Sequence, residues 1–405
     1  MATPKKVYRP FSEIPGHLLP EIFLRLPDPE DLARTSAVCV TFRRLLTDGS
    51  FLRRFRRLHP PQVLSILDLG GFHPAQPPHP SAPAARALAL AADFSFSFLP
   101  SRRRWAVQDI RYGRVLLVRK QNMMAGELSM FPDLVVCDPL HRRYILLPPL
   151  PDDLVASVER QDDEFLGWSC EPCFIPPSDE EAALAEETAF RVIWSACCKT
   201  NMAVFVFSSS TGQWRAAASQ AWSDLVINRQ ALYFIRRHSV DGCVYWVSPM
   251  NNTDLLVLDT RTMEFSVADL PPGEWSQQDI VIVDAGGGRL GMFCIGDENA
   301  SDKSYLCYTI RQNKAESSGE WQMEKISLGS GYRYCIEGGT EKYLILQRIE
   351  AQKYLSLTPP IMEFCKLDVR TMQVERICAE SCGFSGSKAF IYTNFSPSLL
   401  SLPTV

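Results

Sequence analysis

The chain lacks several features that would assign it to a specialised class of protein. No apolar run approaches the roughly 18 residues that a membrane-spanning helix requires, and the opening segment MATPKKVYRP has no apolar stretch of the secretory type. The net charge of −4 argues against a general nucleic-acid binder, which normally shows a strong basic excess. We therefore expect a cytoplasmic or nuclear protein with neither a membrane nor a nucleic acid as its partner.

Motifs for metal, redox or nucleotide chemistry are also scarce. The 13 cysteines follow no framework spacing, which predicts reduced thiols, most of them in the core. Cys170 and Cys173 form a CxxC, but no second ligand pair follows at zinc-site spacing. Gly286, Gly288 and Gly291 match GxGxxG, yet the apolar LGMFCI that continues from them predicts a hairpin instead of the helix that a dinucleotide needs. We expect no catalytic residue, no metal and no cofactor.

Composition divides the chain into regions. Residues 1–10 are expected to be disordered, and residues 11–60 form a basic helical module without glycine between Gly16 and Gly49. Residues 61–87 are predicted to be a connecting strand and a Pro/Ala-rich linker. Residues 88–405 consist of short apolar or alternating runs between turn residues, which indicates an all-β domain. Within it, the acidic stretch at about 152–187 is expected to be a mobile insertion with a short helix near 179–187.

The helical module has the pattern of three short helices. Leu18, Leu19, Ile22, Phe23 and Leu26 recur at helical spacing and form one apolar face. A second helix is expected after the Asp-Pro at 28–29 and a third from about residue 41. Three helices in about 40 residues are too few to bury all this apolar surface. A partner, or the downstream domain, is therefore expected to cover part of it.

The stretch FSEIPGHLLPEIFLRLPDPEDLARTSAVCVTFRRLL resembles the F-box motif over its whole length. The resemblance rests on Ile14-Pro15, on the LRLP at 24–27, on Asp31-Leu32 and on the run from Ser36 to Cys39. Phe42-Arg43 stands where many members have Trp-Arg, and Pro20 is unusual. An F-box implies docking onto a Skp-family adaptor and, through it, onto a cullin. The residues implied for adaptor binding are Ile14, Pro15, Leu18, Leu19, Ile22, Leu26, Leu32, Val38, Cys39 and Phe42.

The C-terminal region repeats a unit of apolar strand, Asp- or Ser-initiated turn, and a second strand. The units lie at 134–151, 204–218, 255–272, 305–328 and 363–379, and segments with a glycine-containing turn and a strand precede four of them. Spacing near 50 residues suits four-stranded propeller blades of kelch-like size. The tail at 386–402 is expected to complete a sixth sheet with segments near 62–69 and 88–99. The expected fold is thus a three-helix module followed by a propeller of six blades, with five or seven as alternatives.

The order of these repeats resembles the F-box-associated propeller region of plant, especially grass, F-box proteins. The resemblance implies a substrate-recognition subunit of a Skp–cullin–F-box ubiquitin ligase that is not itself an enzyme and holds an unknown protein target. Two alternatives remain open: an adaptor-binding scaffold without a role in degradation, and a propeller that binds a small ligand. Trp275, Tyr332, Arg333 and Tyr334 lie between repeats and are candidates for target recognition, although burial between blades is an equal alternative for the aromatics.

Overall fold

The computed structural model describes residues 14–26, 29–46, 48–59, 62–68, 70–100, 105–111, 113–121, 129–158, 171–176, 189–197, 200–224, 236–247, 254–270, 280–285, 289–297, 303–312, 324–340, 343–351, 361–381 and 389–393. The predicted disorder at 1–10 and the predicted helix at 179–187 lie outside them. The chain forms two compact units, Met1–Gln62 and Val63–Val405. In the part of the chain that is described, no helix is long and apolar enough to cross a membrane.

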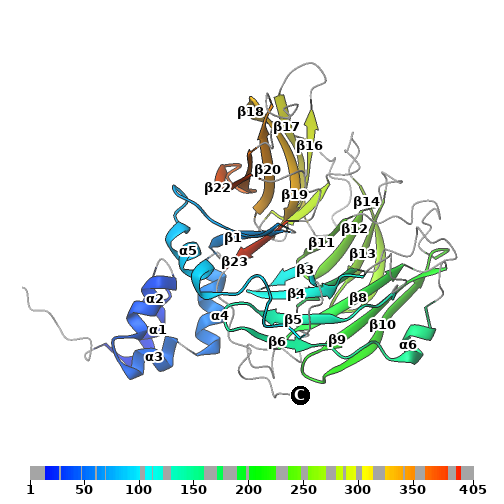
Figure 1. Ribbon diagram of the computed structural model, residues 1–405, viewed down its shortest axis with the longest axis horizontal. Coiled ribbons are helices and arrows are strands. Elements are labelled where there is room, and N and C mark those ends of the chain that lie inside the picture. Colours follow the sequence, from blue (N-terminus) through cyan, green and yellow to red (C-terminus); the bar gives the residue numbers. More distant parts are fainter. Residues whose placement is uncertain are drawn as a thin grey trace, which may run out of the picture. The chain divides into compact units, whose positions relative to one another are not determined.

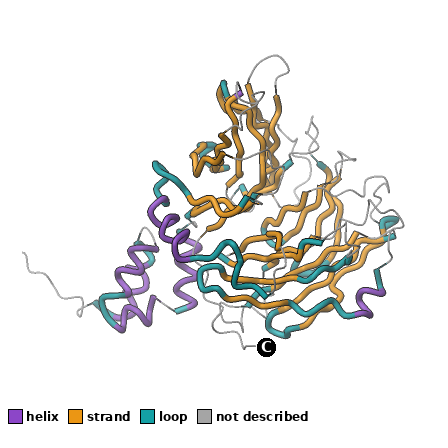
Figure 2. The backbone as a smooth tube through the Cα atoms, viewed as in Figure 1, coloured by secondary structure: helices purple, strands orange, loops and turns teal. Residues whose placement is uncertain are grey.

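The N-terminal unit is helical, as the purple segments at this end of the chain in Figure 2 show. Its elements are η2 (Gly16–Leu18), α1 (Leu19–Phe23), α2 (Pro29–Ser36), α3 (Val40–Leu46) and α4 (Gly49–Leu58). Pro20 lies in the first turn of α1, where a missing N–H is tolerated. Asp48 caps α4, because its carboxylate accepts a 3.0 Å hydrogen bond from the backbone N–H of Phe51.

The second unit consists mainly of strands, which form six antiparallel sheets in the described part of the chain. Five of the sheets have four strands in simple sequential order (Figure 1). Their strands are β3 (Trp105–Arg111), β4 (Arg114–Arg119), β5 (Leu134–Asp138) and β6 (Arg143–Leu146); β7 (Glu171–Ile175), β8 (Arg191–Cys197), β9 (Asn201–Ser208) and β10 (Gln213–Ala221); β11 (Arg236–Val240), β12 (Cys243–Val247), β13 (Asp254–Asp259) and β14 (Glu264–Asp269); β15 (Val281–Asp284), β16 (Arg289–Asp297), β17 (Lys303–Gln312) and β18 (Glu324–Ser330); and β19 (Tyr332–Gly339), β20 (Tyr343–Glu350), β21 (Ile361–Asp368) and β22 (Val374–Ser381).

The sixth sheet joins the two ends of this unit. Strand β1 (Val63–Asp68) pairs with β2 (Gly71–Pro74) on one side and with β23 (Phe390–Thr393) on the other. Helix α5 (Ala82–Ala91) follows β2 and packs Ala85 and Leu88 against this sheet and its neighbours. The short helix α6 (Asp152–Ala156) follows β6.

Apolar packing closes the six sheets into a ring. Six buried clusters are present, and each contains side chains from two successive sheets, the last cluster joining the closing sheet to the sheet of β3–β6. Alternate residues of one strand serve two clusters: on β9, Phe205 faces the preceding sheet, while Val204 and Val206 face the following one. Each sheet is therefore buried on both faces. This arrangement is a six-bladed β-propeller and confirms the predicted fold.

The repeated Asp in the sequence is explained by the turn between the third and fourth strands of a blade. Asp138, Asp259 and Asp368 each accept two hydrogen bonds through Oδ1, from the backbone N–H groups two and three residues further on. The residue four positions after each Asp has a positive φ, 54° at Arg142 and 59° at Met263. The Asp side chain thus fixes a turn whose last residue is left-handed.

Three sequence predictions are wrong. The Pro/Ala-rich segment, predicted to be a linker or loop, contains β2 and most of α5. Residues 88–99, predicted to add a strand to the closing sheet, form the end of α5 and turns. Ala, Leu and an early Pro favour this helix despite the nearby prolines. Residues 171–175, assigned to the acidic insertion, form β7, an apolar strand that pairs with β8.

Candidate functional site

The helical unit has an apolar core of its own. Leu19, Phe23, Leu32, Leu46 and Phe55 are buried in it, together with Leu24 and Phe51. The rings of Phe23 and Phe42 meet edge-on, with centroids 4.9 Å apart. A ring nitrogen of His59 lies 2.7 Å from the carbonyl oxygen of Leu24 and so links the end of α4 to the end of α1. This unit therefore holds its helices together through contacts of its own.

A second set of apolar side chains in the same unit is exposed. Leu18 and Ile22 are 43% and 40% exposed, and Val38 and Val40 are 70% and 64% exposed. Leu18 and Ile22 are four residues apart, so they lie on one side of the first helical segment. Val38 and Val40 flank Cys39 at the junction of α2 and α3, and Cys39 is exposed as well. These exposed aliphatic side chains make this surface a candidate binding site for another protein.

The residues predicted to bind the adaptor fall into three groups. Pro15, Leu18, Ile22, Val38 and Cys39 are exposed. Ile14, Leu26 and Phe42 are half-buried and pack against the core, whereas Leu19 and Leu32 are inside it. Leu19 and Leu32 therefore position the helices and are not available to a partner. Val40 was missed, although it belongs to the same apolar run as Val38 and Cys39.

An ion pair on the surface links the first and last helices of this unit. Glu21 and Arg54 lie 2.6 Å apart, and both side chains are more than half exposed. Exposed pairs of this kind contribute little to stability. Three arginines of this basic module, Arg43, Arg44 and Arg54, are exposed.

The candidates for target recognition on the propeller are distributed differently. Tyr334 is 9% exposed, belongs to the cluster between two blades, and donates a 3.1 Å hydrogen bond to the carbonyl oxygen of Leu328. The ring of Tyr332 lies under the guanidinium of Arg348 at 4.6 Å. Arg333 is exposed, and Trp275 lies outside the described residues. The two tyrosines thus serve blade packing, the alternative that the sequence left open.

Charged side chains of three neighbouring inner strands form a buried network. Asp109 on β3 accepts a 2.8 Å hydrogen bond from the backbone N–H of Phe174 on β7. Arg237 on β11 donates to the carbonyl oxygen of Pro172 at 2.9 Å and lies 3.7 Å from the carboxylate of Glu171. Burial raises the pKa of Asp109, although the charge of Arg237 opposes this effect. Each charge meets a partner from another strand, so the network joins blades together.

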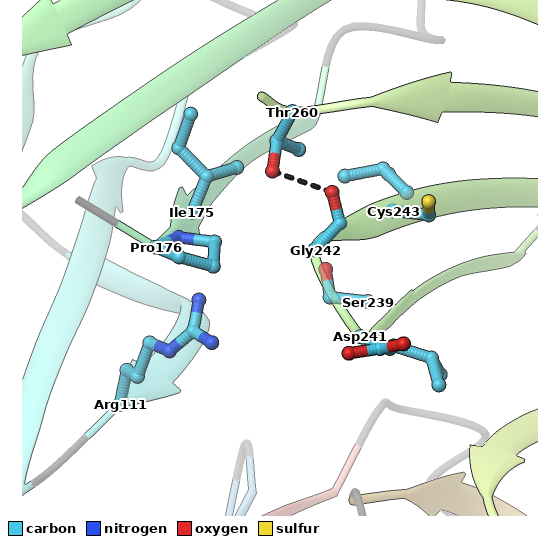
Figure 3. A pocket seen from close by; sticks show the side chains of 10 residues that line it. Arg111, Ile175, Pro176, Ser239, Asp241, Gly242, Cys243 and Thr260 are labelled. Carbon is cyan, nitrogen blue, oxygen red and sulfur yellow. Dashed lines mark hydrogen bonds between the residues drawn. The ribbon is translucent and has the colours of Figure 1, made fainter. Parts of the chain in front are cut away.

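A small pocket lies beside this network at one end of the inner strands. Arg111, Pro176, Ser239, Cys243 and Thr260 are among the residues that line it, and Figure 3 shows the Arg111 side chain extending toward Pro176. The space amounts to about 210 Å³ even when its part open to solvent is included. Pockets for small molecules usually measure about 300–1,000 Å³. The pocket therefore gives little support to a small-ligand receptor.

The described residues of the CxxC and GxGxxG motifs lie in strands. Cys173 is buried in β7, and burial raises the pKa of its thiol to about 12, which makes it a poor nucleophile; Cys170 lies outside the described residues. Gly291 lies within strand β16, as the hairpin prediction required, while Gly286 and Gly288 are not among the described residues. Within the described ranges, no three His, Cys, Asp or Glu side chains are grouped to hold a metal ion.

Comparison with known proteins identifies the first unit. The F-box-like family matches residues 11–58. No curated protein matches the sequence. Similar solved structures include TolB from Acinetobacter baumannii, with 10% identity, a TM-score of 0.38 and coverage of 72% of this chain and 58% of TolB. The β-propeller domain of the Trilobed protease from Pyrococcus furiosus has 8% identity and a TM-score of 0.33, over 68% of this chain and 71% of that domain.

A puromycin-hydrolysing peptidase from Mycobacterium tuberculosis is similar at 11% identity with a TM-score of 0.35, over 68% of this chain and 38% of the peptidase. This chain thus spans less than two thirds of the peptidase and of TolB. Similarity at this level assigns no activity. The family match and the ring of six sheets together give the assignment: the chain carries an F-box-like domain at residues 11–58, followed by a six-bladed β-propeller, and has the architecture of an F-box protein with a propeller.

Proposed function

We propose that this chain is the substrate-recognition subunit of a Skp–cullin–F-box type ubiquitin ligase. In this proposal, the F-box-like unit binds a Skp-family adaptor, the adaptor joins it to a cullin, and the propeller holds a protein target. No residue of the chain makes or breaks a bond. The chain acts by raising the local concentration of the target near the ubiquitin-conjugating enzyme.

The observation that carries the proposal is the division of apolar residues in the F-box-like unit. A unit that already buries Leu19, Phe23 and Leu32 has no internal use for four further exposed aliphatic side chains. Leu18, Ile22, Val38 and Val40 are suited to fill a groove between helices of a partner. Burying a Leu, Ile or Val side chain contributes about 1.5–3 kcal/mol.

The finer assignments belong to the same proposal. The order of the strand–turn–strand units supports a relationship to plant, grass-type F-box proteins with a kelch-like propeller. The cytoplasm or nucleus, where such ligases work, is the proposed location. Among the predicted target-binding residues, the exposed Arg333 fits that role better than the packed Tyr332 and Tyr334 do.

The test is co-purification of the full chain with a Skp-family adaptor. We expect the double substitution Leu18→Asp and Ile22→Asp to weaken binding by more than about 100-fold, because two carboxylates would be desolvated in the interface. Both positions are exposed, so the fold should persist, which circular dichroism checks. Leu90→Asp on α5 is the matched control, since Leu90 is 81% exposed and lies outside the F-box-like unit. Equal binding of the double variant and the wild type would refute adaptor docking.

Target degradation needs a separate measurement. Depletion of the chain should lengthen the half-life of proteins that label with it in proximity experiments. If adaptor binding holds while no labelled protein is stabilised, the chain is an interaction scaffold.

A further inference from the structure

The outer edge of one propeller blade, strand β10, adjoins a groove that the next blade completes. Strand β10 has nine residues, and its second half, Ala218–Ala221, carries no charge. The first half of β10 carries one charge, at Arg215. The other outer strands are charged at Arg143 on β6, Glu264 and Asp269 on β14, Glu324 and Lys325 on β18, and three positions on β22, while Ile326–Ser330 of β18 is uncharged as well. Charges, prolines and short length are the usual means by which edge strands avoid pairing with other chains.

The backbone of this strand has hydrogen-bonding capacity to spare. Strand β10 pairs with β9 on one side, and no other strand in the described ranges pairs with it. Alternate residues of an antiparallel edge strand direct their N–H and C=O groups away from the sheet. A bulge, which is one of the devices that discourage pairing at an edge, lies between Ala216 and Ala218, and the residues from Ala218 to Ala221 after it continue in regular register with β9.

A groove adjoins this half of the strand. Ala218, Ser219 and Gln220 line one wall, and Met263, Glu264 and Phe265 of the next blade line the other. The groove is open to solvent and measures about 770 Å³ when its open part is included, as for the pocket at Arg111, and most of its exposed surface is polar. A polar groove beside an open strand edge suits a polypeptide backbone better than an apolar ligand. Of the six lining residues, Glu264 alone is charged, so a basic side chain complements the groove.

We propose that the outer edge at Ala218–Ala221 binds an extended segment of a target protein as an added β-strand, with a Lys or Arg side chain placed in the groove near Glu264. The main-chain hydrogen bonds would supply affinity, and the groove would select the side chain. This proposal deepens the proposed function, since the segment belongs to the target. Its test measures the binding of a peptide to the propeller, so the result does not depend on adaptor binding.

The probe is a synthetic peptide of about seven residues that alternates valine and lysine, titrated against the full chain by fluorescence anisotropy. We expect saturable binding, together with slower hydrogen exchange in β10. Methylating alternate amide nitrogens of the peptide should weaken binding by about tenfold or more, because it removes the main-chain donors but keeps the charge. Ser219→Lys and Glu264→Gln should each weaken it by about three- to tenfold.

Ser327→Lys on β18 is the matched control and should leave binding unchanged, since it places the same charge on another outer strand. The proposal is overturned if the methylated peptide binds equally well, if the control weakens binding as much as Ser219→Lys, or if about 1 mM peptide shows no binding. A dimer of the chain that Ser219→Lys dissociates would also overturn it, because the edge would then pair with a second copy. The proposed function is tested separately by adaptor binding. If the adaptor still binds, any of these outcomes overturns the strand-addition proposal alone.

Discussion

The indole N–H of Trp214 on β10 donates a 2.8 Å hydrogen bond to the carbonyl oxygen of Pro148, in the segment after β6 of the preceding blade. Trp214 is buried in the cluster between these two blades, where its ring lies 6.0 Å from that of Trp194. One side chain thus joins two blades through both apolar and polar contact.

Replacing Trp214 by Phe should destabilise the propeller by about 1–3 kcal/mol, because the hydrogen bond to Pro148 is lost and the smaller ring leaves a cavity. Urea unfolding followed by circular dichroism measures the change. Tyr144→Phe is the control, since Tyr144 occupies the corresponding position after the turn of the preceding blade and is 40% exposed. A loss of similar size in both variants would contradict the role of the hydrogen bond.

Gly339 on β19 permits a close approach between two blades. A Cβ atom at this position would lie 2.6 Å from the Cγ1 atoms of both Val281 and Val283. Gly339→Ala should therefore cost about 1–3 kcal/mol of unfolding free energy through overpacking. Gly296→Ala is the comparison, because its Cβ would make an ordinary 3.5 Å contact with the Cys307 sulfur. Thermal or urea unfolding that ranks the two variants equally would refute the steric explanation.

The turn at Asp138 predicts a stabilising substitution. Arg142 is exposed and has a φ of 54°, a conformation that costs non-glycine residues energy; Gly212 occupies the equivalent position in the next blade. Arg142→Gly should raise the unfolding free energy by about 0.5–1 kcal/mol. Arg143→Gly, one residue further on in strand β6, should instead lower it by about 0.5–1 kcal/mol. Opposite signs in denaturant unfolding are the expected result.

A histidine at the ring closure makes stability depend on pH. His73 lies 2.8 Å from Asp68 and 3.0 Å from Glu380 of the last complete blade. Burial lowers the pKa of His73, but hydrogen bonds and charge from Asp68 and Glu380 outweigh it, so the net pKa is raised. The imidazolium therefore stabilises the fold fully below about pH 6.5, and this contribution is lost as pH rises through the higher pKa of the folded state.

The pKa of Asp68 is lowered, because hydrogen bonds and the charge of His73 outweigh the desolvation that acts in the opposite direction. Its contribution is therefore lost as pH falls below about 4. The stability difference between wild type and His73→Gln should be largest at about pH 5–6 and should shrink toward about pH 9. Unfolding curves at several pH values measure this difference. A difference that grows with pH would show that His73 is neutral in the folded chain.

Much of the propeller was predictable because its repeats leave local signals. Asp138, Asp259 and Asp368 mark turns by their own side-chain hydrogen bonds, so their spacing indicates the outer hairpins directly. Strand β7 was not predicted because its five residues lie between acidic stretches, and its burial depends on pairing with β8, which follows the second of these stretches. Helix α5 was not predicted because prolines precede it and Pro83 lies in its first turn, although Ala85 and Leu88 have helical spacing.

The candidate site was predictable in location but not in detail. Leu18 and Leu19 are adjacent and equally apolar, so composition cannot show which of them faces the core; the structure buries Leu19 and exposes Leu18. Val40 begins α3, and its exposure depends on how α3 packs against α2. Recognition at β10 depends on a free strand edge and on a neighbouring blade, neither of which is a property of a local sequence.

The pairing of β1 with β23 has a consequence for biosynthesis. A ribosome delivers Val63 long before Phe390, so the first strand of the propeller must wait for the last one while five blades are being translated. Until residue 393 leaves the exit tunnel, the ring of the nascent domain stays open, because β1 has not yet paired with β23. A premature stop codon just before residue 390 would remove the strand partner of β1 and leave the ring unclosed.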